Sequence, residues 1–552
     1  MARSWRQFAA MPAWIICMIL MIMAAAYRIA LLATTFRRLD ADQAIVGLMA
    51  FHIQAGDRPV FFYGQPYQGS AEAYGAALFF HFFGAGAWTA RLPTLCFSVA
   101  FVGAVYWLGR TLYGPYTAFL AALFLALGPS ILISSSTACG FGYIEVMVCG
   151  TALLLLITRY PDLRCMPIPA ALAGGILIGF GLWTQPMMAE YLLPVVGALA
   201  ARLGRRSETA GSGQRLAIAL GVLLLGTAIG SAPLLIDNLR QHWETITYLR
   251  TRTAGGNHLV TAGRVLTEAL PVLTGLVTPT SVPSLFAHLV ALHRFGYVAG
   301  LACGLGIMAR VVIGPRNLFR RITCLLTPAT TERGSGRASD QADNIPRDGM
   351  LALFVLSCLL FFIGSSFGAA RAATLMPRYL IPLYTAAPLV IDCFVPTGAG
   401  SRHWLLATGA VGVLLASGLL VATTTSLPRA STTAVAGAAL SPPPIDGLEK
   451  LLESRHVRVA YTGYWLANRL SFETHEQVLG LPILAVGQLG MVRIPAYLTI
   501  AASLPAQRLA WILTAGSHDD QVFRRLLRAE HITAARLPWE ELVVYTGISR
   551  RP

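Results

Sequence analysis

Long apolar stretches separated by short polar loops dominate the first 424 residues of the chain. A helix needs about 20 mostly apolar residues to cross the hydrocarbon core of a bilayer, and Ala13 to Thr34 is the first stretch of that length. On this pattern we expect eleven transmembrane helices, over residues 13–33, 88–109, 116–135, 142–158, 169–183, 187–201, 216–235, 289–309, 350–366, 379–395 and 404–424. Residues 1–424 are therefore predicted to form an all-α polytopic membrane domain.

Arginines gather in two of the polar loops and indicate the orientation. One loop is flanked by Arg202, Arg205, Arg206 and Arg215, and the other holds Arg310, Arg316, Arg320, Arg321, Arg333, Arg337 and Arg347. Because arginine-rich loops stay in the cytoplasm, we expect the N-terminus inside and, after eleven crossings, the C-terminus outside. No A-x-A-like cleavage site closes the first apolar run, which is therefore expected to be a retained span. Residues 34–87, 236–288 and 425–552 then fall on the outer face.

The pattern changes after the last predicted span. Residues 425–444 belong to a Thr/Ala/Ser-rich stretch that ends in three prolines, so we expect a linker there. Short apolar runs at 457–461 and 508–513 are strand candidates. Helical spacing predicts two amphipathic helices, one with Leu448, Leu451 and Leu452 on a common face and one with Val522, Leu526 and Leu527. Residues 445–552 are therefore predicted to form a small extracytoplasmic α/β domain. Its acids, such as Glu449, Glu453, Asp519 and Asp520, are expected on its surface.

Composition supports a membrane protein and excludes other classes. Hydrophobic residues make up 55% of the chain and charged residues 12%, and the mean hydropathy is +0.61. Burying so much apolar surface requires lipid. The formal charge of +16 lies in loops between spans and not on a soluble domain, so nucleic acid is not an expected partner. The cysteines show neither a disulfide framework nor zinc-ligand spacing.

Two carboxylates, Asp40 and Asp42, follow the first predicted span by about one helical turn. Acids at this depth are costly unless they are paired or used. They either take part in chemistry, or pair with Arg37 and Arg38, or cap a helix over residues 44–54. Residues 56–74 then combine aromatic, glycine and polar side chains, which is typical of a loop at the membrane interface around a wet cavity that Glu72 faces.

At this point the sequence resembles a known family. The run ADQAIVGLMA at 41–50, followed by FFYGQPYQGSAEAY at 61–74, is similar to the bacterial membrane glycosyltransferases of GT-C fold. Their relatives are the protein O-mannosyltransferases, the aminoarabinose transferases of lipid A and the Rgt-type transferases of rhizobial lipopolysaccharide. The resemblance continues in FGYIE at 141–145, GLWTQP at 181–186, RYLIP at 378–382 and YWLANRLSF at 464–472, and so covers nearly the whole chain.

The resemblance implies an inverting transfer of a sugar from a polyprenyl-phosphate donor to an envelope glycan, lipid or protein on the outer face of the bacterial inner membrane. The acid that ends the first span is the catalytic base of the family, and its place matches Asp42. The usual next residue is Glu, where this chain has Gln43, so a possible metal ligand is missing and Asp40 is the candidate to compensate. A divalent metal is thus the one cofactor considered, with no ligands assigned.

For the donor phosphate we expect Arg378 first and Arg371 second, because guanidinium binds phosphate oxygens bidentately and Arg378 begins an outer-face helix. The alternative for both is snorkelling to lipid headgroups. Glu145 is either a substrate ligand or a first-turn acid favoured by the helix dipole, and Trp183 is either a sugar platform or a member of the interfacial aromatic belt. The full set of expected substrate-binding residues is Arg58, Tyr63, Gln65, Tyr67, Glu72, Glu145, Trp183, Gln185 and Tyr379, with Arg58 assigned to the acceptor.

A different class of function remains open. A transporter or flippase for a lipid-linked sugar would use the same basic outer cavity, but such proteins commonly contain internal repeats and matched broken helices, which this sequence lacks. A scaffold protein would leave the paired acids and the glycine-aromatic loop unexplained. The sequence pattern therefore favours an enzyme with a fixed site.

Overall fold

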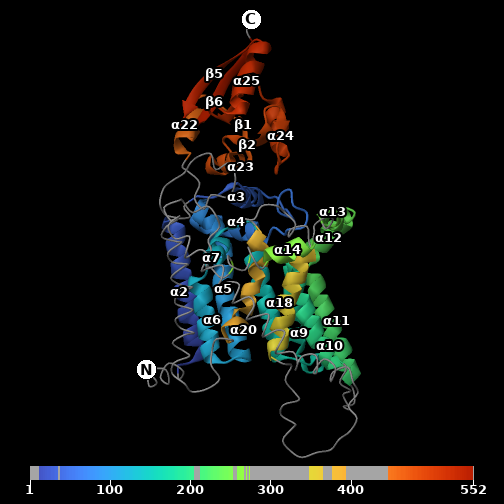
Figure 1. Cartoon of the computed structure of the whole chain (residues 1–552). Coiled ribbons are helices and arrows are strands. Elements are labelled where there is room, and N and C mark those ends of the chain that lie inside the picture. The colour runs from blue at the N-terminus through green and yellow to red at the C-terminus, as the bar shows by residue number, and fades with distance from the viewer. Residues whose placement is uncertain are drawn as a thin grey trace, which may run out of the picture.

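The computed structural model in Figure 1 describes residues 11–34, 38–203, 212–252, 258–265, 269, 273, 347–364, 376–392 and 445–550. A bundle of helices carries a small sheet domain at one end. The predicted spans 289–309 and 404–424, the predicted linker 425–444 and Arg371 lie outside the described residues.

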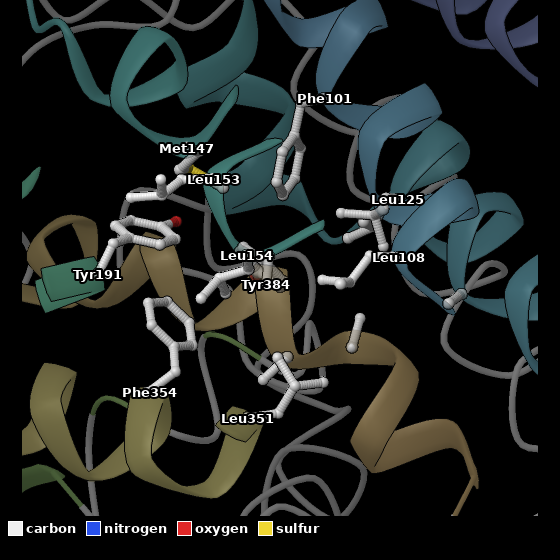
Figure 2. Packing of buried hydrophobic residues seen from close by; sticks show 14 of the residues in the cluster. Phe101, Leu108, Leu125, Met147, Leu153, Leu154, Tyr191, Leu351, Phe354 and Tyr384 are labelled. Carbon is white, nitrogen blue, oxygen red and sulfur yellow. The ribbon is translucent and has the colours of Figure 1, made fainter. Parts of the chain in front are cut away.

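The bundle contains the longest helices in the described part of the chain. They are α2 (Ala13–Thr34), α5 (Ala87–Leu112), α8 (Tyr143–Arg159), α9 (Ile168–Thr184), α10 (Ala189–Leu203), α11 (Ser212–Gly230) and α18 (Arg347–Gly364). Their apolar side chains form one buried core, part of which is shown in Figure 2, where Tyr191 of α10 packs on Phe354 of α18 with ring centroids 4.5 Å apart. Helices α9 and α11 touch backbone to backbone at Gly175, Gly179 and Gly226, where small residues allow close approach.

The expected number of eleven transmembrane helices is not confirmed. In the described part of the chain, three helices are long and apolar enough to cross a membrane, at Ala13–Thr34, Ala87–Leu112 and Gly213–Gly230, or four if a bent pair is one span. That bent pair is α6 (Pro115–Leu127) with α7 (Ser130–Thr137), at an angle of 67°. The expected span 379–395 is instead the 3-10 helix η5 (Met376–Ala386) followed by α20 (Ala387–Asp392).

Buried Arg28 of α2 bridges the ends of α6 and α7 at the break between them. Its guanidinium donates to the carbonyls of Leu125 and Ala126 at 3.1 and 2.7 Å and to the Ser136 hydroxyl at 3.0 Å. The carbonyls at the end of α6 have no helical partners, so the arginine supplies the missing donors. A broken helix is therefore tolerated inside the bundle.

Short helices cover the end of the bundle that faces the sheet domain (Figure 1). They include α3 (Ala41–Gln54), α4 (Ala71–Phe83), α12 (Ala232–Arg240), α13 (Glu244–Arg252) and α14 (His258–Arg264). Two further short elements, η1 (Leu163–Cys165) and η2 (Pro186–Met188), connect helices of the bundle. Helix α3 begins three residues before the expected position, at Ala41.

The C-terminal part is an α/β domain, as expected. Its strands β1 (Val459–Gly463), β2 (Leu479–Ala485), β3 (Gln488–Leu489), β4 (Leu509–Thr514), β5 (Ile532–Trp539) and β6 (Leu542–Arg550) form a sheet of order β3-β2-β1-β4-β6-β5. Strand β1 pairs in parallel with β2 and β4, and the other pairs are antiparallel. The helices are α22 (Asp446–Ser454), α23 (Tyr464–Glu473), α24 (Ala496–Ser503), η6 (Ala506–Arg508) and α25 (His518–Ala529). Both predicted strands are present, as β1 and β4.

The amphipathic helix expected around Val522, Leu526 and Leu527 is α25, although its buried apolar residue is Phe523 and Leu526 is 46% exposed. One expectation for this domain is wrong. Asp520 is fully buried, because Tyr545 and Arg536 on the sheet and the Gly516 N–H all donate to its carboxylate. Burial alone would raise the pKa of Asp520, but these donors lower it below its ordinary value. The acid is thus a structural part of the domain.

Helix α23 joins the domain to the bundle by packing along α3. Val459, Phe472 and Leu479 of the domain are buried in one cluster with Leu48 and Ala50 of α3. The two parts of the chain therefore share a hydrophobic core at this boundary.

Candidate active site

The start of α3 is held by a polar chain around Asp40. Asp40 is the N-cap residue, and its two carboxyl oxygens accept from the backbone N–H and the side-chain amide of Gln43 at 2.9 and 2.8 Å. Arg91 of α5 in turn donates to Gln43 Oε1 at 2.6 Å. Burial raises the pKa of Asp40, although the Gln43 N–H acts in the opposite direction. Asp40 thus has the capping role that the sequence left as an alternative.

Asp42 lies in the first turn of the same helix, and its side chain is 24% exposed. Its Oδ1 atom accepts a 2.5 Å hydrogen bond from the Tyr464 hydroxyl and lies 3.7 Å from Nη2 of Arg493. Both partners belong to the C-terminal domain. Among the described residues no donor bonds to Oδ2.

Arg493 is a functional candidate that the sequence did not reveal. Its Nε donates to the Tyr464 hydroxyl at 3.2 Å, its Nη1 donates to the carbonyls of Tyr63 and Gly64 at 3.3 Å, and its side chain is 7% exposed. Tyr464 belongs to the run YWLANRLSF, which carries part of the family resemblance, but the sequence assigned this tyrosine no role. The one available signal was an arginine in the apolar run 490–495, since a buried charge must have partners.

Arg378, at the start of η5, is surrounded by aromatic rings. Its Cζ lies 4.9 Å from the Tyr379 ring centroid and 5.8 Å from that of Phe141, and its Nη2 donates to the Tyr379 hydroxyl at 2.9 Å. In the described part of the chain, its buried Nε has no hydrogen-bond partner and no carboxylate lies within ion-pair distance. A largely buried cation with spare donors is suited to an anionic oxygen such as that of phosphate.

Tyr67 lies near both arginines. Its ring stacks on Tyr248 of α13 with centroids 5.1 Å apart. Burial raises the pKa of Tyr67, while the charges of Arg378 and Arg493 act in the opposite direction. Of the expected residues, Arg378 and Tyr379 therefore bind each other, Asp42 binds Tyr464 and Arg493, and Tyr67 lies close enough to both arginines for their charges to affect the pKa of its hydroxyl.

Other expected residues hold the outer loop in place. Trp183 Nε1 donates to the Val60 carbonyl at 3.0 Å. Gln185 Nε2 donates to Gln68 Oε1 at 3.2 Å and to the Phe141 carbonyl at 2.9 Å. Since Gln185 is 6% exposed, its amide serves the loop in this structure.

The far side of the outer loop faces the C-terminal domain. The Tyr63 hydroxyl lies 2.9 Å from Nδ1 of His52, and burial raises the pKa of Tyr63 to about 12. Arg58 is exposed and donates to the carbonyls of Ile53 and Asp57. Gln65 lies in a turn, where its backbone N–H donates to the Phe62 carbonyl. The structure does not bring Arg58 into contact with the cluster around Asp42.

Glu72 and Glu145 are both buried, and Glu72 is bound to the backbone of Gly140. Glu72 accepts from the Gly140 N–H and from the Thr94 hydroxyl, and burial raises the pKa of Glu72. Gly140 has φ +95°, and a Cβ there would lie 3.3 Å from the Asp42 carbonyl oxygen. This position therefore requires glycine. Glu72 and Glu145 are 6% and 0% exposed, so neither faces an open cavity.

The donor set does not fit a metal site in the described part of the chain. No group of three or more His, Cys, Asp and Glu side chains gathers there. Asp40, the candidate to compensate for Gln43, has both carboxyl oxygens occupied by Gln43. The reaction proposed below therefore uses protein side chains alone.

The sequence matches no protein-family model, and no curated protein is detectably similar to it in sequence. Among solved structures, ArnT from Cupriavidus metallidurans in the apo state has a TM-score of 0.53 at 14% identity, covering 95% of this chain and 97% of that one. The same protein bound to undecaprenyl phosphate has a TM-score of 0.54 at 12% identity, covering 96% and 99%. The oligosaccharyltransferase of Archaeoglobus fulgidus with Zn and sulfate reaches 0.48 at 11% identity, covering 96% and 73%.

The likeness to ArnT extends over nearly the full length of both chains, through the helical bundle and the C-terminal domain. It confirms the fold expected from the sequence motifs. The chain thus has the GT-C fold, the fold of the membrane glycosyltransferase ArnT.

Proposed function

We propose that this protein is an inverting glycosyltransferase that moves a sugar from a polyprenyl-phosphate donor to an envelope glycan, lipid or protein acceptor on the outer face of the inner membrane. The observation that carries the proposal is that the partly exposed Asp42 carboxylate and the half-buried Arg378 guanidinium each keep a polar atom, Oδ2 and Nε, without a partner among the described residues. A GT-C fold supports it, since ArnT of that fold binds undecaprenyl phosphate. A base and an anion site are the two groups that this transfer needs.

In the proposed reaction, Oδ2 of Asp42 takes the proton from the acceptor nucleophile. The nucleophile attacks the anomeric carbon on the face opposite the phosphate, and the bond between that carbon and the phosphate oxygen breaks. The electron pair leaves with the polyprenyl phosphate, whose charge Arg378 stabilises. Developing positive charge on the sugar is stabilised by the nearby Asp42 carboxylate.

The hydrogen bonds support Asp42, and not Asp40, as the base, because both oxygens of Asp40 are used in capping. Tyr67 and Tyr379 are proposed to line the sugar or phosphate site, since both lie beside Arg378. Arg371 stays the second phosphate candidate. For the remaining expected residues, Arg58, Tyr63, Gln65, Glu72, Glu145, Trp183 and Gln185, we propose indirect roles in shaping the outer loop, with Arg58 available to an acceptor.

We propose residues 1–424 as the catalytic membrane domain, 425–444 as a linker and 445–552 as an extracytoplasmic domain of a bacterial inner-membrane protein. Helices α3 and α4 and the C-terminal domain lie at one end of the bundle (Figure 1). Helix α10 ends and α11 begins at the opposite end, and Arg202 and Arg215 favour the cytoplasm for that end. Sugar transfer would then take place on the outer face.

A deletion strain tests this function. We expect its envelope to lack one sugar and its membranes to accumulate the corresponding polyprenyl-phosphate sugar, facing outward. Wild-type protein should restore the sugar, and Asp42→Asn protein should not. A flippase would instead leave the donor on the cytoplasmic face, and restoration by Asp42→Asn protein would contradict the proposed function.

A further inference from the structure

We propose that Tyr464 and Arg493 of the C-terminal domain are positioning residues that aim the Asp42 carboxylate, so that docking of this domain completes the active site. The inference rests on the proposed function of Asp42. It assigns the C-terminal domain a direct part in turnover.

A continuous hydrogen-bond chain runs from the domain to the base. Nε of Arg493 donates to the Tyr464 hydroxyl at 3.2 Å, and that hydroxyl donates to Oδ1 of Asp42 at 2.5 Å. Burial and the Asp42 charge raise the pKa of Tyr464, so its hydroxyl keeps its proton at neutral pH. With Oδ1 held in this way, rotation of the carboxylate is restricted and Oδ2 is presented to the acceptor.

Arg493 is itself fixed from several directions. Its Nη1 is shared between the carbonyls of Tyr63 and Gly64 in the outer loop, and its Cζ lies 5.8 Å from the Phe62 ring centroid. One side chain of the domain thus orients both the base and the loop beside it. Lysine has a single nitrogen and cannot make these contacts together.

Docking and positioning can be separated by mutation, because different residues carry them. Tyr497 donates to Glu476 Oε1 at 2.5 Å, and Glu476 also bonds to His52 of α3 at 3.0 Å. This group lies in the same domain boundary, but none of its hydrogen bonds reaches Asp42. Tyr497→Phe is therefore a matched control for Tyr464→Phe, since each removes one hydroxyl that donates to a carboxylate at the boundary.

The test uses the full-length protein in liposomes with polyprenyl-phosphate sugar and acceptor. We expect Tyr464→Phe to lower kcat about tenfold with little change in the KM for the donor, because orientation of the base matters only in the transition state. Tyr497→Phe should keep most of the wild-type kcat. Arg493→Gln should lower kcat as much as Tyr464→Phe or more, and Arg493→Lys should recover part of it because the charge beside Asp42 is kept.

Equal kcat values for Tyr464→Phe and Tyr497→Phe, in an assay where Asp42→Asn is inactive, would overturn this inference and leave the proposed function standing. Loss of donor affinity with unchanged kcat would overturn it too, since the two residues would then serve binding. If Arg493→Gln does not fold, Tyr464→Phe still decides, because it removes one oxygen and keeps the ring. An active Asp42→Asn protein would instead contradict the proposed function itself.

Discussion

Phe472 of the C-terminal domain stacks on Phe51 of α3, with ring centroids 5.4 Å apart and planes inclined by 18°. The Phe472 ring also covers the Cα atom of Gly47, one turn earlier on α3, so closely that a Cβ at that position would overlap the ring. Glycine inside a helix costs about 1 kcal/mol relative to alanine. Here the missing side chain makes room for the domain.

Gly47→Ala should therefore weaken docking although alanine favours the helix. We expect a net destabilisation of about 1–3 kcal/mol, the usual cost of overpacking a buried contact. Limited proteolysis and thermal unfolding in detergent measure it. Gly221→Ala in α11 is the matched control, since a Cβ there meets open space. A Gly47→Ala protein as stable and protease-resistant as the control would show that this contact does not hold the domain.

Docking should also depend on pH through His52 and Glu476. The hydrogen bond that His52 donates to Glu476 raises the pKa of His52 above 6.5, although burial acts in the opposite direction. Burial would raise the pKa of Glu476, but His52 and Tyr497 lower it below 4.5. Protonated His52 thus stabilises docking fully below about pH 6.5. This stabilisation is lost as the pH rises through the higher pKa that His52 has in the docked state. Ionised Glu476 stabilises docking above about pH 4.5. This stabilisation is lost as the pH falls through the lower pKa that Glu476 has in the docked state.

Hydrogen exchange of the α23 amides measures this dependence. We expect protection to be greatest between about pH 4.5 and 6.5 and to fall toward pH 9, after correction for the intrinsic exchange rate. Asp57 and Tyr63 also face His52 and do not change this direction, because the Asp57 charge favours the imidazolium and Tyr63 stays neutral. In His52→Gln protein, protection should no longer fall as the pH rises toward 9. Equal protection at pH 6 and pH 9 in the wild type would refute the ion pair as a docking contact.

Arg378→Ala should weaken binding of polyprenyl phosphate about 10- to 100-fold, since a hydrogen bond to a charged group contributes about 1.5–3 kcal/mol. Turnover should fall as well, because the phosphate is present in both ground and transition states. Arg378→Lys should restore part of the affinity. Arg159 lies at the opposite end of α8 from Tyr143, and Arg159→Ala also removes one positive charge. This control protein should bind polyprenyl phosphate with wild-type affinity. Unchanged affinity in Arg378→Ala would move the phosphate site elsewhere.

The orientation of the chain can be tested with single cysteines. Ala502 at the end of α24 is exposed, and Cys165 in η1 is exposed between α8 and α9. In a background without other cysteines, a membrane-impermeant maleimide should label Ala502→Cys protein in intact spheroplasts. It should label Cys165 only after permeabilisation. The reverse result would place the C-terminal domain in the cytoplasm and contradict an outer-face reaction.

Local patterns predicted local structure well in this chain. The apolar run at 13–33 became α2, and the runs at 457–461 and 508–513 became β1 and β4. The roles of Asp40 and Asp42 depended on finer detail. A helix that begins at Ala44 would leave both acids outside it, whereas one that begins at Ala41 makes Asp40 the cap and places Asp42 in the first turn. Helix starts are uncertain by a few residues from sequence alone.

Long-range contacts account for the rest. Asp42 and its partners Tyr464 and Arg493 are more than 400 residues apart, and no local periodicity relates them. Asp520 was expected at the surface because its helix is amphipathic, but Arg536 and Tyr545 from other elements satisfy its charge. Buried charges of this kind depend on partners that only the tertiary fold brings together.

A single-turnover measurement on purified protein loaded with donor tests the central claim most directly. Asp42→Asn keeps the size of the side chain but cannot take a proton, so transfer should fall about 10² to 10⁴-fold while donor binding stays at the wild-type level. Asp40→Asn is the matched control: asparagine also caps helices, and transfer should remain close to wild type. A wild-type transfer rate in the Asp42→Asn protein would contradict the account, because the chemistry would then have no base at the position where the two domains meet.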